Sequence, residues 1–134
     1  MTVDAAEVVT LLHSRLLESR DPSAAEDLFA PDFVSHNMPP GFPPGVPGVM
    51  RFFEMFRAAF PDVQVTIDEL VADGDRAAIA TTMTGTHTGE VMGMAPTGRR
   101  VSVTGIDVVR VEDGRIVEHR GLTDTVGLMR QLAS

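Results

Sequence analysis

Residues 105–124 read GIDVVRVEDGRIVEHRGLTD, two segments of alternating apolar and polar residues on either side of the tripeptide Glu112-Asp113-Gly114. Such alternation around residues with a strong turn preference predicts an antiparallel β-hairpin. Asp107 interrupts the apolar face of the first segment, and His119 lies in the second. Gly121 follows where the alternation would place an inward side chain. The hairpin therefore indicates both the kind of fold and the place of a candidate site.

The remainder of the chain places helices before strands. Period-two alternation and turn residues predict strands at 63–72, 76–88, 99–111 and 115–123. Helical spacing and capping residues predict helices at 4–20, 21–29, 48–60 and 125–132, with a short strand at 33–36. Asp4 and the pair Asp21-Pro22 are expected to start the first two helices. This order favours one α+β domain over residues 1–134, not an alternating βαβ fold.

The segment PPGFPPGVPG at 39–48 contains five prolines and must be a loop. Two interpretations stay open for it. The loop could lie over a cavity as a stiff lid, or it could serve only as a linker between secondary-structure elements.

Composition excludes several kinds of function. The 134 residues carry a net charge of −8, which disfavours nucleic acid and anionic membranes as partners. The chain has no cysteine, so disulfides, cysteine–zinc sites and thiol nucleophiles are excluded. The N-terminal residues lack a signal-peptide pattern, and no apolar run reaches membrane-spanning length, so we expect a cytoplasmic protein. Because Tyr and Trp are also absent, no phenol can hold an oxyanion.

The length of the hairpin turn decides which residues face Asp107. A three-residue loop places Asp107 opposite His119 and Gly105 opposite Gly121. A two-residue turn places Asp107 opposite Arg120 instead. We prefer the first register, because the second would turn charged residues toward the core.

The preferred register brings an acid and a base together on a buried face, beside two glycines that leave empty volume. Such a pocket floor could be catalytic, with Asp107 and His119 as the reacting pair. The other interpretation is an internal ion pair, with Gly105 and Gly121 relieving crowding in a bent sheet. The residues alone do not decide between the two.

Further residues are candidates for contact with an apolar substrate. They come from the proline-loop entrance, the phenylalanine stripe of the third helix, and the TGTHTGE segment with the residues after it: His36, Asn37, Phe53, Phe56, His87 and Met92, together with Gly105 and Gly121. A purely structural role, such as a core position or a loop cap, stays open for these residues. No HxH or HxxxH spacing supports a metal site, and no GxGxxG follows a strand, so we expect neither a metal nor a cofactor.

Four segments of the chain resemble the SnoaL-like polyketide cyclases, within the superfamily of ketosteroid isomerase and nuclear transport factor 2. They are PPGFPPGVPGVMRFF, FPDVQVTIDELVADGDRAAI, TGTHTGEVMGMAPTGRRV and VEDGRIVEHRGLTDTVGLMRQL, and the likeness runs from about Leu28 to Leu132. The resemblance implies a cone-shaped α+β barrel in which a curved antiparallel sheet wraps around the N-terminal helices and a deep apolar pocket. It also implies an intramolecular aldol cyclisation without metal or cofactor, on a hydrophobic small molecule.

The chain departs from the pattern of that family at two positions. The resemblance places the acid/base Asp of the cyclases at Gly121 and a histidine of the cyclases at Asp107. Either Asp107 supplies the acid from across the hairpin, oriented by His119 and with His87 or Asn37 stabilising an enolate, or the reaction differs. A polyketide-tailoring hydroxylase and a non-catalytic binding module are the alternatives. Isomerisation of the ketosteroid type is disfavoured without tyrosine, and a homodimer through the sheet is expected.

Overall fold

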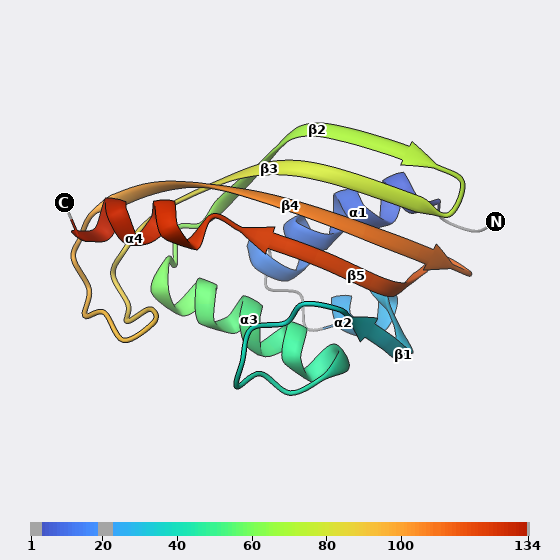
Figure 1. The fold of residues 1–134 in the computed structure, drawn as a ribbon, viewed down its shortest axis with the longest axis horizontal. Helices are drawn as coiled ribbons and strands as arrows, with labels where there is room; N and C mark the ends of the chain where they lie inside the picture. Colours follow the sequence, from blue (N-terminus) through green and yellow to red (C-terminus); the bar gives the residue numbers. More distant parts are fainter. Residues whose placement is uncertain (1–3, 19–22, 134) are drawn as a thin grey trace.

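A curved five-stranded sheet packs over helices in the computed structural model, which describes residues 4–18 and 23–133 (Figure 1). The strands are β1 Phe29–Ser35, β2 Gln64–Asp73, β3 Arg76–Thr86, β4 Arg100–Glu112 and β5 Arg115–Thr123. Their order in the sheet is β1-β5-β4-β3-β2, with β2 to β5 antiparallel. The predicted α+β class is confirmed. The sheet is mixed and not wholly antiparallel, because β1 pairs in parallel with β5.

The helices are α1 Ala5–His13, the π-helical turn η1 Ser14–Glu18, α2 Ala24–Leu28, α3 Gly45–Ala59 and α4 Thr125–Ala133. Asp4 caps α1 as predicted, accepting a hydrogen bond from the Glu7 backbone N–H at 2.9 Å. The predicted helix start at Asp21-Pro22 lies outside the described residues. Helix α3 begins at Gly45, earlier than predicted, because a helix tolerates proline in its first turn and Pro47 lies there.

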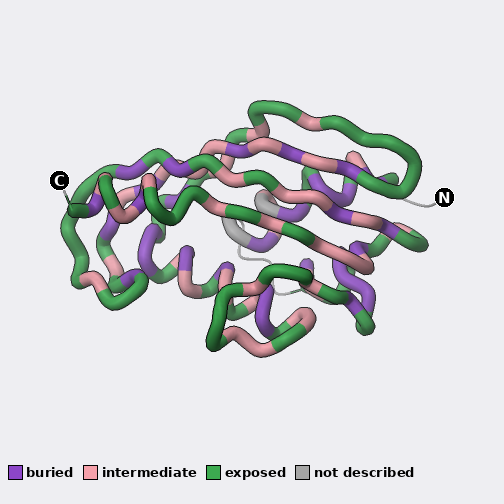
Figure 2. The backbone as a smooth tube through the Cα atoms, in the orientation of Figure 1, coloured by how far each residue is buried: buried purple, intermediate pink, exposed green. Residues whose placement is uncertain are grey.

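The inner face of the sheet and the helices share one apolar cluster. Val101, Val103 and Val109 of β4 point inward and are almost fully buried. In Figure 2, buried, intermediate and exposed stretches follow one another along the central strands of the sheet. The three valines pack in a common cluster with buried residues of α1 and α3. Among the described residues, none of the helices combines the length and the apolar character that a membrane span requires.

The turn between β4 and β5 differs from the prediction. Asp113 and Gly114 have φ angles of 51° and 77°, so the turn has two residues and Glu112 pairs with Arg115. Positive φ at both central positions is typical of a type I′ turn, whose twist matches that of the flanking strands. The preferred three-residue loop was therefore wrong.

A β-bulge then shifts the register by one residue between Arg110 and Val111. Beyond the bulge, Asp107 faces Gly121 directly, Val109 faces His119, and Gly105 faces a threonine, Thr123. Both predicted partners of Asp107, His119 and Arg120, were wrong as directly opposed residues. The bulge returns the charged residues of β5 to the outer face, which is the arrangement that the preferred register also predicted.

Candidate active site

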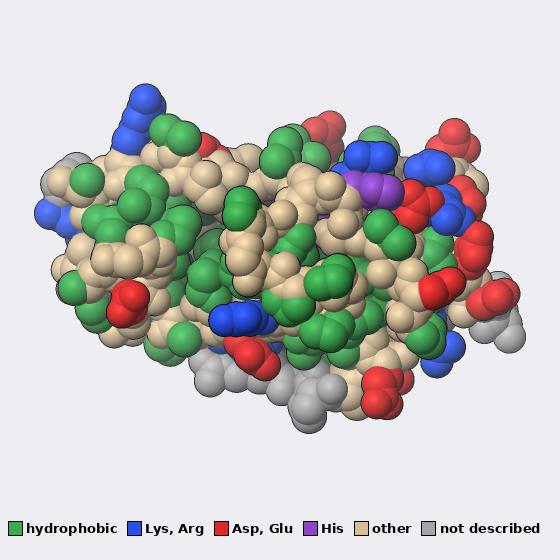
Figure 3. All heavy atoms as spheres, turned by 60° about the horizontal axis from the view of Figure 1, so that its bottom comes forward, with side chains coloured by type: hydrophobic (Ala, Val, Ile, Leu, Met, Phe, Trp, Pro, Cys, Tyr) green, Lys and Arg blue, Asp and Glu red, His purple; other side chains and the backbone are tan. Residues whose placement is uncertain are grey.

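A cavity of about 340 Å³ lies between the inner face of the sheet and α3. Its apolar lining comes mainly from β1, α3 and the central strands and includes Phe29, Val49, Phe52, Phe53, Phe56 and Val103. Hydrophobic side chains gather across the face of the molecule on this side (Figure 3). The volume falls within the range of cavities that bind small organic molecules.

Asp107 and His119 meet at the floor of this cavity. The Nε2 atom of His119 lies 2.7 Å from Oδ1 of Asp107, and the two side chains are only 17% and 14% exposed. The contact is diagonal across β4 and β5, which side chains of this length can span. Nδ1 of His119 is buried and has no hydrogen-bond partner among the described residues. The arrangement favours the tautomer with its proton on Nε2, which donates to the carboxylate.

The missing side chain at Gly121 explains how the Asp107 carboxylate reaches this place. A Cβ atom built on Gly121 would lie 2.6 Å from Oδ1 of Asp107 and 2.7 Å from Cε1 of His119. Real Cβ atoms do not approach other atoms so closely. The carboxylate of Asp107 thus occupies the volume into which a side chain at position 121 would extend.

Asn37 is committed to the backbone of Gly121. Its Oδ1 atom accepts the Gly121 N–H at 3.0 Å, and its Nδ2 atom donates to the Gly121 carbonyl. The amide therefore prolongs the pairing of β1 with β5 beyond Ser35. Because Asn37, Met38 and Pro39 all line the cavity, the start of the proline loop forms part of its rim.

Seven of the residues predicted at the site line the cavity: Asn37, Phe53, Phe56, Gly105, Asp107, His119 and Gly121. His36, His87 and Met92 are placed elsewhere. The His87 side chain is fully buried beside Phe60, and its Nδ1 atom accepts the Thr97 backbone N–H at 3.1 Å. It tethers the loop between β3 and β4. Met92 is 43% exposed in that same loop.

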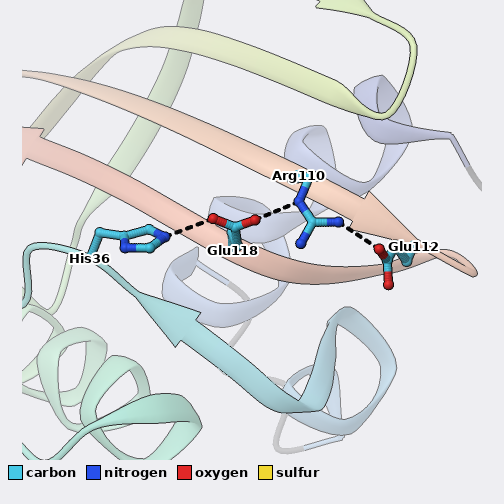
Figure 4. Close-up of polar contacts among 4 residues, drawn as sticks. All are labelled: His36, Arg110, Glu112 and Glu118. Carbon is cyan, nitrogen blue, oxygen red and sulfur yellow. Dashed lines mark hydrogen bonds and ion pairs between the residues drawn. The ribbon is translucent and has the colours of Figure 1, made fainter.

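His36 belongs to a chain of polar contacts on the outer side of the sheet (Figure 4). Its Nε2 atom lies 2.7 Å from Glu118, which also accepts from Nε of Arg110, and Arg110 in turn reaches Glu112 at 2.6 Å. The hydrogen bond with His36, followed by that with Arg110, lowers the pKa of Glu118 from 4.5 to about 2. These contacts fasten the end of β1 to β5, one residue before the rim of the cavity.

The depressed pKa predicts how Glu118 contributes to stability. A carboxylate with a lowered pKa stabilises the folded state above its unfolded pKa of 4.5 and loses this contribution as the pH falls toward about 2. We expect Glu118→Gln to unfold at lower urea than the wild type near neutral pH, and the difference to shrink through that window. Far-UV circular dichroism measures both midpoints.

Glu69→Gln serves as the matched control. Glu69 is exposed on β2, so the substitution removes the same charge at a site outside these contacts. A difference in urea midpoint between Glu118→Gln and the wild type that stays constant as the pH falls would contradict the stabilising role of the ionised Glu118.

Several cavity residues escaped the sequence analysis. Phe29 and Phe52 line the wall, and the hydroxyl groups of Ser35, Thr81, Thr123 and Thr125 supply polar atoms. Thr81 shares the inward face of β3 with Ile79, so the alternation of that strand could have identified it. Thr123 shares the inward face of β5 with His119 and Gly121, so the alternation of that strand could have identified it as well.

The fold and the cavity define a class of protein, an α+β domain of the nuclear transport factor 2 type with an apolar pocket inside a curved sheet. Within that class, the model of the SnoaL-like polyketide cyclases matches residues 7–132. The chain belongs to the SnoaL-like polyketide cyclase family.

Two named cyclases are similar to part of the chain. The chain is 46% identical over 48 residues to the aklanonic acid methyl ester cyclase DnrD of Streptomyces peucetius, covering 36% of this chain and 33% of that enzyme. It is 44% identical over 69 residues to the cyclase AcmA of Streptomyces galilaeus, covering 52% of this chain and 46% of that enzyme. The match thus spans less than half the length of these curated relatives.

Two solved structures match over nearly the whole chain. IdmH of Streptomyces antibioticus, to which polyketide cyclase activity is ascribed, is 34% identical with a TM-score of 0.86 over 98% of this chain and 100% of IdmH. AclR of Streptomyces galilaeus, to which a hydroxylase activity is ascribed, is 28% identical with a TM-score of 0.81 over 97% of this chain and 98% of AclR.

Proposed function

We propose that this chain is an enzyme of antibiotic biosynthesis that closes a ring of a hydrophobic polyketide by intramolecular aldol reaction, an isomerising carbon–carbon bond formation without a cofactor. Asp107 is the general base, and His119 is the residue that positions it. The resemblance of the family to known cyclases supports the reaction class. The apolar cavity supports a hydrophobic ring system as substrate.

One observation carries the proposal: the Asp107 carboxylate lies where a side chain from position 121 would reach. Asp107 and Gly121 are directly opposed on β4 and β5. An acid donated by β4 can therefore take the place of an acid donated by β5, with the same imidazole beside it. Compared with the cyclase pattern, this chain then carries the acid on β4 and not on β5, and the site keeps its carboxylate.

The residues support a balanced proton cycle. Asp107 removes an acidic proton next to a carbonyl group, and the resulting enolate carbon attacks a second carbonyl carbon of the same molecule. The new carbon–carbon bond leaves an alkoxide, which recovers the proton from the Asp107 carboxyl group. Burial in the cavity keeps water from competing for the enolate, and the hydrogen bond from His119 fixes the carboxylate in position.

The product mass distinguishes this proposal from its competitors. We would incubate the protein with aklanonic acid methyl ester, the substrate in the names of its relatives, and analyse the products by chromatography and mass spectrometry. Cyclisation gives an isomer of unchanged mass with a new retention time. Recovery of unaltered ligand that nevertheless binds in calorimetry would refute the enzyme and support a binding module.

A hydroxylase is the second candidate, favoured by the structural likeness to AclR and by the absence of an acid at position 121. Hydroxylation adds one oxygen atom to the mass of the product and consumes molecular oxygen. The reductant would come from a partner protein or from the aromatic substrate itself. If the protein consumes oxygen in the presence of a reduced anthraquinone, the result would support hydroxylation as the function in place of cyclisation.

We further propose that the protein forms a homodimer through the outer face of the sheet. Ile106 and Leu122 are 53% and 75% exposed and face each other across β4 and β5, next to the partly exposed Val108. Exposed apolar pairs in the middle of a sheet are typical of an interaction surface.

We expect Leu122→Asp to shift the protein from dimer to monomer in analytical ultracentrifugation, because burying a charged side chain in the interface carries a large desolvation cost. Met92→Asp, an equal change at an exposed position in the loop between β3 and β4, should leave the dimer intact. A monomeric wild type, or a dimer that survives Leu122→Asp, would contradict the proposed face.

A further inference from the structure

The aldol cycle leaves an oxyanion to be stabilised, and the two groups first expected to do so are not placed for it. His87 lies outside the cavity, and both polar ends of the Asn37 amide bind the backbone of Gly121. A donor for the substrate oxygen must therefore be found among the remaining polar groups that line the cavity. Two threonines on either side of Gly105 meet this requirement.

The three residues form one row across the sheet. Thr81 of β3 pairs with Gly105 of β4, and Gly105 pairs with Thr123 of β5. All three line the cavity, so the two threonine side chains stand on either side of a position that has none. A Cβ atom built on Gly105 would lie 3.2 Å from Oγ1 of Thr81 and 4.0 Å from Oγ1 of Thr123. The resulting gap is a notch in the cavity floor with a hydroxyl group on each side.

The Thr81 hydroxyl forms only a weak hydrogen bond within the protein. Thr81 is 4% exposed, and its hydroxyl donates to the Gly105 carbonyl at 3.4 Å, longer than a normal O–H···O hydrogen bond. A buried hydroxyl without a good acceptor costs free energy, which a ligand oxygen would recover. Thr123 is held in place from the next residue, because the Asp124 backbone N–H donates to the Thr104 carbonyl at 2.9 Å.

We propose that Thr81 and Thr123 form a hydrogen-bonding subsite over Gly105 for a carbonyl or enolate oxygen of the substrate. The notch lies two residues from Asp107 on the same face of β4, a separation of roughly 7 Å along a strand. The substrate class is then a hydrophobic ketone whose acidic C–H group and a carbonyl oxygen are separated by a few bonds. The subsite rests on the proposed function for its reaction, but its binding chemistry can be measured without any reaction.

The test uses two probes of one shape, 1-tetralone and tetralin, which differ by a carbonyl oxygen. Their affinities are measured by ligand-observed NMR for the wild type, Thr81→Val, Thr123→Val and the double variant. Each valine keeps the shape of threonine but loses the hydroxyl group. We expect each single variant to bind 1-tetralone about threefold to tenfold more weakly, the effect of one neutral hydrogen bond, and to bind tetralin unchanged.

Two further variants complete the test. Thr104→Val, on the outer face of the same strand, should change neither affinity. Gly105→Ala should weaken 1-tetralone by filling the notch. The subsite is overturned if the wild type does not bind 1-tetralone, if the double variant binds it as the wild type does, or if tetralin weakens by the same factor. Normal 1-tetralone binding by Asp107→Asn, with turnover unaffected, would instead refute the base and leave the subsite standing.

Discussion

Asp107→Asn is expected to lower the turnover number about 10²–10⁴-fold, the contribution of one general base. Asparagine keeps the size of aspartate and can still accept the hydrogen bond from Nε2 of His119. In the wild type, this atom lies 2.7 Å from Oδ1 of Asp107. It cannot accept a proton from the substrate. The affinity for substrate should change much less than the turnover, because the apolar walls of the cavity are unaltered.

Asp32→Asn is the matched control for this change, since Asp32 is an exposed aspartate on β1. It removes one carboxylate outside the cavity and should leave turnover unchanged. Folding of both variants is followed by far-UV circular dichroism, because the chain has no tryptophan or tyrosine for fluorescence. Turnover by a folded Asp107→Asn protein at the wild-type rate would remove Asp107 from the mechanism.

Gly121→Ala is expected to destabilise the protein by about 1–3 kcal/mol, the usual cost of an extra group in a packed site. The new methyl group would lie 2.6 Å from the carboxylate of Asp107 and 2.7 Å from the ring of His119. One of the two side chains must move, and their hydrogen bond is then strained or broken. Gly105→Ala, where the nearest atom is 3.2 Å away, is the matched control and should cost less.

A double-mutant cycle tests whether the cost arises from the Asp107 carboxylate. In an Asp107→Gly background the carboxylate is absent and the His119 ring can shift into the vacated space. The free energy lost on Gly121→Ala should therefore be smaller in that background than in the wild type. Equal losses in the two backgrounds would mean that Asp107 and Gly121 do not share this volume.

The sequence was sufficient for the α+β class and for the meeting of Asp107 with His119. Helices before strands gave the class, and the apolar face of β4 gave the direction of Asp107. The register of the hairpin was wrong because the turn has two residues, not three, and because a bulge that the residue pattern does not indicate then shifts the pairing by one. The contact survives this error because His119 is a diagonal neighbour of Asp107 and its side chain is long enough to reach the carboxylate.

Other parts of the site depend on distant contacts that a local pattern does not encode. The parallel pairing of β1 with β5 brings Asn37 to Gly121, 84 residues along the chain. The burial of His87 depends on the C-terminal end of α3, where Phe60 packs against its ring. The threonine notch needs three strands in register at once, and one of its sides is set by the bulge.

The most direct measurement is hydrogen exchange at the acidic carbon of the substrate, since it isolates proton removal from ring closure. Aklanonic acid methyl ester would be incubated in deuterium oxide with the wild type or with Asp107→Asn, and deuterium at that carbon followed by NMR. The account predicts enzyme-dependent incorporation with the wild type and only the solvent rate with the variant. Equal incorporation by the two proteins, both faster than in solvent, would show that a different group removes the proton.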